Sequence, residues 1–174
     1  MLRPTHGDRP RIHPTAFVSE ASVLIGAVEV GEGVGIWPVV VLRADEGPLR
    51  VGPFSNIQDN SVVVAPPGGM EIGAHTTLGH AVVCRARRVG SLCLIGNGAV
   101  VGEGAVIGDR CIVAAGAVVP DGMVVPEGSF VAGVPAEVKG PITERHLERI
   151  RATAERYARK AQEYREEGLG LRGE

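Results

Sequence analysis

Aliphatic residues recur at every sixth position along most of this chain, and that spacing restricts the fold more than any other feature. The longest uninterrupted series is Val89, Ile95, Val101, Ile107, Val113, Val119, Val125 and Val131. A period of six matches neither an amphipathic helix, with its period of about 3.6, nor a single alternating strand. It matches a chain that forms a short strand, turns and repeats, so that stacked turns bury their apolar faces together. Three such sides close a triangular coil of about eighteen residues, which predicts an all-β protein, a parallel β-helix.

The composition agrees with a narrow prism. Aromatic residues make up only 3% of the 174 residues, and glycine, which suits tight corners, occurs 25 times. The formal net charge of −2 gives no electrostatic reason to expect nucleic acid or a membrane as a partner. The sequence has no apolar run long enough for a membrane span and no signal-peptide core at its start. We therefore expect a cytoplasmic protein.

The chain divides into four predicted segments. They are a polar lead-in (1–11), a β-helix domain of about seven coils (12–140), a C-terminal α-helix (141–168) and a tail (169–174). The six-residue period is interrupted at 43–50 and at 65–69, and such interruptions usually map to loops on one face of a repeat protein. Cys93 and Cys111 fall on inward positions one coil apart, which favours small buried apolar fillers over a disulfide.

After Pro141 the period changes to that of a helix. Thr143 has a side chain suited to a helix N-cap, and Gly168 follows the last apolar residue. Between them, apolar residues alternate at spacings of three and four: Leu147, Ile150, Ala154, Tyr157, Ala161 and Tyr164. Such a helix is about 37 Å long, close to the height of roughly 34 Å expected for seven coils. We expect it to lie along the prism and to bury its apolar stripe there or against a neighbouring subunit.

Six motifs occur in a fixed order along the chain. They are VVLRADEGPLRVG (39–52), SNIQDNSV (55–62), IGAHTTLGH (72–80), LIGNGAVV (94–101), IVAAGAVVP (112–120) and AGVPAEVKGPIT (132–143). The set resembles the hexapeptide-repeat superfamily of left-handed β-helices and, within it, the γ-class carbonic anhydrase family. The RxD, NIQDN and GH combination is specific for that family, whereas AAGxVVP and GVPA are shared with many hexapeptide acyltransferases. Parallel crossovers are right-handed in most proteins, so the left hand is implied by the resemblance alone.

The resemblance implies a homotrimer with active sites between adjacent subunits, where three histidines from two chains hold a catalytic metal, usually zinc. This sequence has Val64 at the first ligand position, His80 at the second and Arg85 at the third. Valine offers no lone pair, and arginine is a permanently protonated donor that repels a dication. We expect no metal cofactor, and zinc only if His75 or Cys84 joins His80 in a rebuilt site of an active carbonic anhydrase.

A changed metal site alters the expected chemistry. Without a metal, water keeps its high bulk pKa instead of a value of about 7, so the sequence predicts that zinc-dependent CO₂ hydration is lost. Arg85 would place a guanidinium where the family has its metal, with Asp45 and Asp59 as candidate partners. With Arg43 and Gln58 they form the polar cluster that the resemblance places around the site. Such a cleft would bind a small anion, bicarbonate or a carboxylate, although inter-subunit salt bridges and corner hydrogen bonds would use the same residues.

Two further functions stay open. A CoA-dependent acyltransferase would use His80 as its general base. Gln58 and His80 are the two candidate catalytic residues of the site. Arg85, Arg87 and Arg88 would then bind CoA phosphates, although clustered arginines more commonly form a solvated or inter-subunit face. A purely structural trimer, acting as a scaffold or as a subunit of a larger assembly, would leave His80 as a hydrogen-bonded interface residue.

Overall fold

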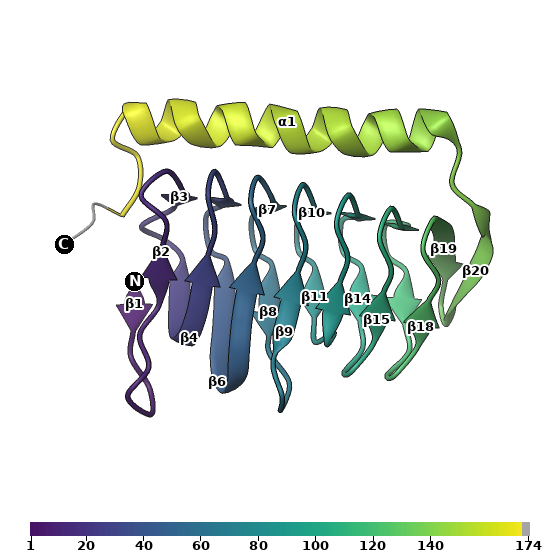
Figure 1. Cartoon of the computed structure of the whole chain (residues 1–174), viewed down its shortest axis with the longest axis horizontal. Helices are drawn as coiled ribbons and strands as arrows, with labels where there is room; N and C mark the ends of the chain where they lie inside the picture. Colours follow the sequence, from purple (N-terminus) through teal and green to yellow (C-terminus); the bar gives the residue numbers. More distant parts are fainter. Residues whose placement is uncertain (172–174) are drawn as a thin grey trace.

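The structure, a computed structural model, describes residues 1–171 and shows a triangular prism of stacked coils with one long helix along its outside (Figure 1). One side of the prism, which we call the helix face, lies beneath that helix and contains one strand from each of seven coils. These strands are β3 (Phe17–Val18), β5 (Gly35–Ile36), β7 (Asn56–Ile57), β10 (Thr77–Leu78), β13 (Leu94–Ile95), β16 (Ile112–Val113) and β19 (Ser129–Gly133). Neighbouring strands pair in parallel, so that Leu78 stands between Ile57 and Ile95 inside the prism. The predicted parallel β-helix of about seven coils is confirmed.

A second side, the valine face, carries an outward column of one valine per coil. The column consists of Val23, Val41, Val62, Val83, Val100 and Val118. Its strands are the first parts of β4 (Val23–Val30) and β6 (Val41–Val51), then β8 (Val62–Val64), β11 (Val83–Cys84), β14 (Val100–Val101) and β17 (Val118–Val119). Because β4 and β6 continue around a corner without a break, this side and the third side form a single twelve-stranded sheet.

The third side, the charged face, alternates charge over its first five strands, before Val106 and Val124 continue the same column. Its strands are β2 (Arg11–Ile12), the second parts of β4 and β6, β9 (Met70–Ile72), β12 (Arg88–Val89), β15 (Val106–Ile107) and β18 (Val124–Val125). The register places Arg11, Glu29, Arg50, Glu71 and Arg88 in one outward column. Glu29 Oε2 lies 3.3 Å from Arg11 Nη2 and 3.5 Å from Arg50 Nε. Opposite charges across neighbouring strands favour this register over one that would align like charges.

The two interruptions of the period lie at the same corner of the prism, but only one of them is a loop. Residues 43–50, predicted as a loop, instead belong to the continuous strand β6, in which Leu42, Ala44 and Leu49 stay buried. Residues 65–69 do form a turn. The two segments touch, because a Cβ added to Gly47 would lie 2.5 Å from the Gly69 backbone nitrogen. Pairing of β6 with β4, β8 and β9 explains the difference, since tertiary hydrogen bonds extend the strand across a stretch without the six-residue period.

Both ends of the chain pack on the prism. The predicted polar lead-in contains β1 (Leu2–Arg3), which pairs in parallel with β4. Near the other end, the Leu171 backbone N–H donates to the Val18 carbonyl (2.8 Å). Residues 172–174 of the predicted tail lie outside the described residues. The last coil closes with β20 (Ala136–Pro141), which runs antiparallel to β19.

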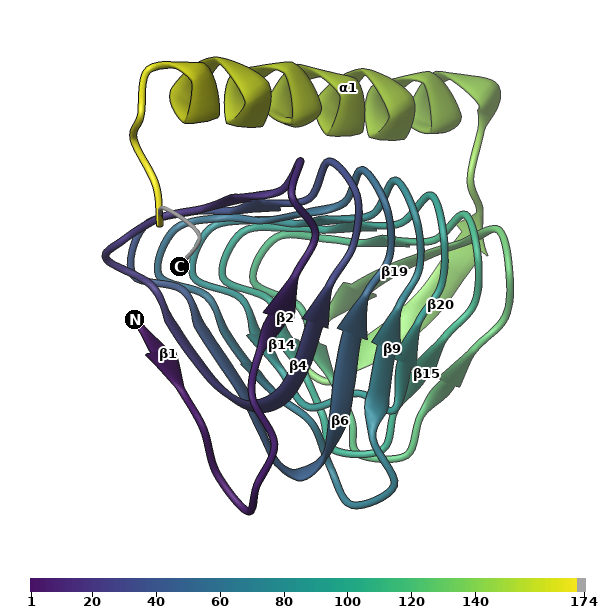
Figure 2. The same cartoon turned by 60° about the vertical axis from the view of Figure 1, so that its left-hand side comes forward.

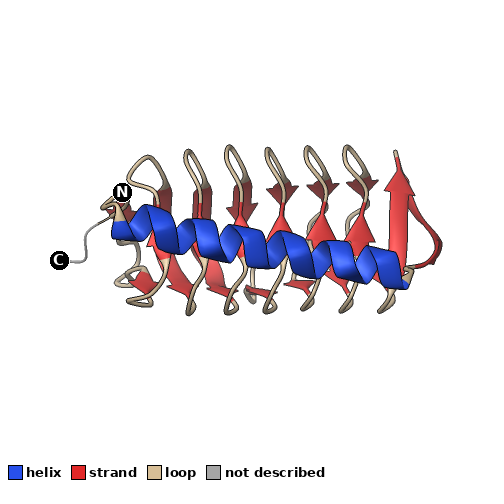
Figure 3. Cartoon of the chain, turned by 90° about the horizontal axis from the view of Figure 1, so that it is seen from above, coloured by secondary structure: helices blue, strands red, loops and turns tan. Residues whose placement is uncertain are grey.

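The C-terminal helix α1 (Glu144–Glu166) begins at the predicted cap. The Thr143 side chain accepts a hydrogen bond from the His146 backbone, and His146 accepts one from Thr143 in return. The apolar stripe faces this chain's own prism, where Ile150, Ala154 and Ala161 are buried, and the helix runs the length of the helix face (Figures 2 and 3). Among residues 1–171, no helix has the length and apolar character needed to cross a membrane.

An aromatic cluster fixes the C-terminal half of α1 to the first coils. The Trp37 ring centroid lies 5.3 Å from that of Phe17, 5.4 Å from Tyr157 and 5.3 Å from Tyr164. These are four of the six Phe, Trp and Tyr rings of the chain, and they lie outside the narrow prism interior, as its width requires.

The three cysteines are free and buried. Cys93 and Cys111 are stacked neighbours, since the Cys111 backbone N–H points at Cys93 Sγ (3.5 Å). They fill the core as predicted.

Candidate functional site

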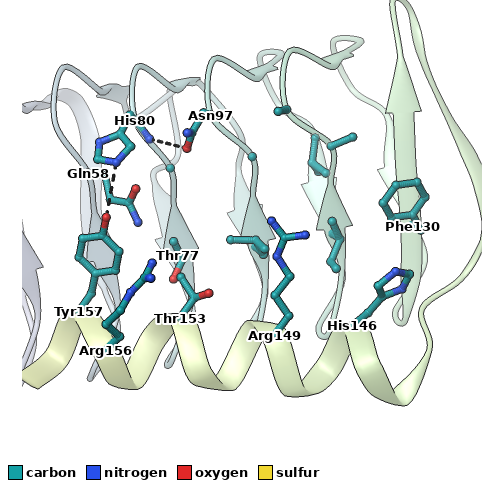
Figure 4. A pocket seen from close by; sticks show the side chains of 17 residues that line it. Gln58, Thr77, His80, Asn97, Phe130, His146, Arg149, Thr153, Arg156 and Tyr157 are labelled. Atoms are coloured by element: carbon teal, nitrogen blue, oxygen red, sulfur yellow. Dashed lines mark hydrogen bonds between the residues drawn. The ribbon is translucent and has the colours of Figure 1, made fainter.

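His80 lies at the corner between the helix face and the valine face. Its Nδ1 is 3.0 Å from Asp59 Oδ2, and its Nε2 is 3.4 Å from the Tyr157 hydroxyl of α1. Its backbone N–H donates to Asn97 Oδ1 (3.1 Å), as Figure 4 shows. The imidazole is therefore held by a carboxylate on one ring nitrogen and faces a phenol with the other.

Three successive coils build this corner in the same way. The residue after Asp59, the residue after His80 and the equivalent Gly98 all adopt a left-handed conformation, with φ of +62° at Asn60, +55° at Ala81 and +67° at Gly98. The Ala81 N–H donates to the Asp59 carbonyl (2.9 Å), and the Gly98 N–H donates to the His80 carbonyl (2.8 Å). The stacked turns thus place Asp59 beside His80.

Gln58 points to the other side of this corner, under α1. It is buried, and its Nε2 donates to Asn56 Oδ1 (3.1 Å), while Asn56 Nδ2 donates to Thr77 Oγ1 (2.9 Å). Sequence analysis grouped Gln58 and Asp59 in one polar cluster. In the folded chain Asp59 belongs to the turn and contacts His80, whereas Gln58 bonds to Asn56 beneath α1.

The edge of the valine face carries a second column, two residues after the valine of each coil, which contains Arg43, Val64 and Arg85. Arg43 pairs directly with Val64 across β6 and β8. Val63 pairs with Cys84 across β8 and β11, so Arg85, the residue after Cys84, follows Val64 on the next coil. Arg43 Nε contacts Asp45 Oδ1 at 3.1 Å, and Arg85 Nη2 contacts Glu103 Oε2 at 2.7 Å.

Within the single chain, Arg85 contacts neither Asp45 nor Asp59, the two carboxylates predicted as its partners in the cleft. Asp45 pairs with Arg43 and Asp59 with His80, whereas Arg85 pairs with Glu103, a residue that sequence analysis did not consider. The predicted repeat could have identified this ion pair, since Glu103 follows Arg85 by eighteen residues, which is one coil. Within one chain, strand β11 separates His80 from Arg85, so the polar cluster expected from the resemblance is not assembled by a single subunit.

The side chains at the three ligand positions do not fit a metal. Val64 has no donor atom, the Arg85 guanidinium is cationic and bound to a carboxylate, and only His80 offers a ring nitrogen. The two replacements considered for a rebuilt site lie elsewhere. His75 stacks on Phe54, with ring centroids 5.4 Å apart. Cys84 points into the prism, where burial raises the pKa of its thiol to about 12. Within residues 1–171, no three His, Cys, Asp or Glu side chains gather closely enough to hold a metal ion.

The proposed phosphate-binding arginines do not converge either. Arg88 Nη2 binds Asp109 Oδ1 at 2.7 Å on the charged face, and Arg85 binds Glu103 on the neighbouring face. Ala86 between them is buried in the core. A single chain therefore presents Arg85 and Arg88 as partners of its own carboxylates.

Comparison with known proteins finds hexapeptide-repeat and carbonic anhydrase relatives. The family model described as bacterial transferase hexapeptide (six repeats) matches residues 88–121. Protein YrdA of Escherichia coli is 34% identical over 176 residues, which covers 97% of this chain and 96% of the relative. A carbonic anhydrase of Geobacillus kaustophilus is 39% identical over 169 residues, or 95% and 91% of the two chains.

The solved structures include a hexapeptide transferase family protein from Anaplasma phagocytophilum. It superposes with a TM-score of 0.88 at 32% identity, over 94% of this chain and 98% of that one. The match confirms the left-handed β-helix with its C-terminal helix. On the motifs, the repeat and these relatives together, the chain belongs to the γ-carbonic-anhydrase-like family of hexapeptide-repeat proteins.

Proposed function

We propose that this protein is a homotrimer whose inter-subunit cleft binds a small anion, bicarbonate or a carboxylate, and does not carry out zinc-dependent CO₂ hydration. The observation that carries the proposal is the ion pair of Arg85 with Glu103 at the third metal-ligand position, with Val64 beside it at the first. Arg85 would present a guanidinium at the cleft, where an anion would compete with Glu103 for it. Two ligands are missing, and the one histidine left is engaged by Asp59.

The valine face supports the trimer. Six outward valines form a continuous apolar column, and Val83 in its middle is 39% exposed in the single chain. An apolar stripe on every coil is a surface that a second copy of the same prism would cover. Val64 and Arg85 lie at the edge of this face, so its contact with another subunit would form a cleft beside them.

Ion pairs at this edge are weak enough to exchange for a ligand. The side chains of Arg43 and Asp45 are 45% and 33% exposed, and those of Arg85 and Glu103 are both 44% exposed. Exposed pairs of this kind stabilise a protein by about 0–1 kcal/mol. A planar carboxylate or bicarbonate could take the place of the Asp45 or Glu103 carboxylate at little cost, because both guanidinium groups present a fork of donors.

Metal analysis and anion titration test the proposal together. Elemental mass spectrometry of purified, unchelated trimer should find no stoichiometric zinc, iron or cobalt. Calorimetric titration should show bicarbonate or acetate binding that Arg85→Gln removes and Arg50→Gln, an exposed arginine of the charged face, leaves unchanged. About one metal per chain would contradict the loss of the metal site. A metal-free trimer that binds neither anion would refute the anion cleft and favour the purely structural role.

Acyl transfer is the second candidate, favoured by the Asp59–His80 contact. A carboxylate on one ring nitrogen orients a histidine so that the other nitrogen can remove a proton from an acceptor, as in Asp–His pairs of hydrolases. Acetyl-CoA should then bind the trimer, binding should weaken in Arg87→Gln, and transfer to an amine or hydroxyl should stop in His80→Gln with binding intact. Absence of acetyl-CoA binding would remove this candidate.

A further inference from the structure

A cavity of about 470 Å³ lies between α1 and the helix face, on strands β10, β13 and β16 (Figure 4). It arises from a change of side-chain size along one outward column of that face. Trp37 and Gln58 fill the space beneath the helix on the earlier coils, but the next positions are Gly79, Gly96 and Ala114. The helix therefore crosses these coils without a side chain beneath it in that column.

Two arginines of α1, Arg149 and Arg156, extend into this cavity (Figure 4). Neither has an acidic residue three or four positions away on the helix, and neither forms an ion pair within residues 1–171. By contrast, Arg145, Arg151 and Arg159 each have a glutamate at such a position. Arg151 lies 4.0 Å from Glu144, whereas Arg149 and Arg156 have no carboxylate partner within residues 1–171.

The remaining lining suits a ligand with an apolar middle. None of the residues that line the cavity is Asp or Glu, and its ends are formed by His80 and Tyr157 on one side and by His146 stacked on Phe130 on the other. Between the two guanidinium groups, the floor includes Leu94 and Ile112 on adjacent coils. Because Arg149 and Arg156 are seven residues apart, their Cα atoms are separated by about 10.5 Å along the helix, two turns on the same face.

From this arrangement we infer that the cavity is a binding site for short aliphatic dicarboxylates, with one carboxylate on each arginine and the carbon chain over Leu94 and Ile112. A guanidinium fork pairs with a carboxylate through two parallel hydrogen bonds, and the spacing of two turns leaves room for a short chain between them. Inorganic phosphate would satisfy one arginine only and would leave the apolar floor uncovered. All lining residues belong to one chain, and His80 at one end of the cavity is shared with the cleft proposed between subunits.

Calorimetric titration with succinate, glutarate, butyrate and inorganic phosphate tests the inference on the full chain. Succinate or glutarate should bind at least about tenfold more tightly than butyrate, because butyrate has no second carboxylate and therefore makes one charge-assisted contact fewer. Arg149→Gln and Arg156→Gln should each weaken dicarboxylate binding by about tenfold or more and abolish the preference over butyrate. Arg145→Gln, on the same helix but outside the cavity, and Arg85→Gln, in the proposed cleft, should leave it unchanged.

A variant that fills the cavity gives an independent check. Ala114→Leu keeps both arginines, places a larger side chain on the floor and should block succinate and butyrate alike, with its fold verified by circular dichroism. Failure of wild-type protein to bind any dicarboxylate at millimolar concentration would overturn the inference. So would tighter binding of phosphate than of succinate, unchanged binding in Ala114→Leu, or binding that only Arg85→Gln removes; the last result would place the anion in the inter-subunit cleft.

Discussion

Restoring the two missing histidines should give this protein a metal site. In the double variant Val64→His with Arg85→His, the resemblance to the γ-class family predicts three histidines around each inter-subunit cleft, with His80 already in place. Three imidazole ligands with an open fourth position are sufficient for catalytic zinc. We expect about one zinc per chain in the folded trimer, measured by elemental mass spectrometry.

The cost to the fold follows from the surroundings of the two positions. Arg85 and Glu103 are both 44% exposed, so loss of their pair costs about 1 kcal/mol or less and leaves no buried charge. Val64 is 8% exposed, so an imidazole there is partly desolvated at a cost of about 1–3 kcal/mol. The metal-free double variant should thus be about 1–4 kcal/mol less stable than wild type and still folded.

Zinc should then restore a similar amount of stability. At a free concentration of one hundred times its Kd, a ligand stabilises the folded state by about 2.7 kcal/mol. For a chain of this size, that corresponds to a rise in Tm of roughly 5–11 °C. Adding His80→Gln to the double variant removes the third ligand and should remove the zinc-dependent shift. A folded, trimeric double variant that takes up no zinc would refute our placement of the site.

Four other predictions follow from packing and exposure. Leu78→Ala should lower the free energy of unfolding in urea by about 3–5 kcal/mol, because Leu78 is fully buried between neighbouring coils; a loss below about 1 kcal/mol would contradict its inward position. Val83→Glu should convert the proposed trimer to monomers in light scattering, since it places a charge in the valine column; a trimer that persists in the variant would exclude that face as the interface. Trp37→Ala should release the C-terminal half of α1, with faster tryptic cleavage there than in wild type and a loss of about 3–5 kcal/mol. The thiol of Cys84 should resist alkylation at pH 8 in the native protein, because burial raises its pKa to about 12 and keeps it protonated; rapid native-state labelling would show that the coil opens there.

Local patterns predicted the regular parts of the molecule well. Each coil contributes its own apolar residues and corner, so a period of six was enough to predict stacked parallel strands and about seven coils. The helix cap at Thr143 was also readable, because capping depends on residues only three positions apart. Burial of Cys93 and Cys111 followed from the same register.

Errors arose where partners come from distant coils. Residues 43–50 lack the repeat period, yet three neighbouring strands pair with β6 and keep it extended. Arg85 was expected to pair with Asp45 or Asp59 in the cleft, whereas within the single chain it pairs with Glu103, one coil further along. The partners of a surface ion pair depend on which side chains lie on the same face once the coils have stacked. A local sequence motif does not contain that information.

The sequence by itself determined the repeat, the corners and the terminal helix, because each is a property of residue type and spacing. That Val64 and Arg85 stand at two metal-ligand positions is an expectation from the family resemblance. Only the tertiary structure decided that α1 covers its own prism, that Asp59 holds His80, and that Arg149 and Arg156 overhang a cavity above Gly79 and Gly96. The physical reason is that an α-helix and a β-helix differ in the number of residues per turn and in the rise per turn. Which residues of the one meet which coils of the other depends on how the two elements are docked, and here the aromatic cluster around Trp37 fixes that docking.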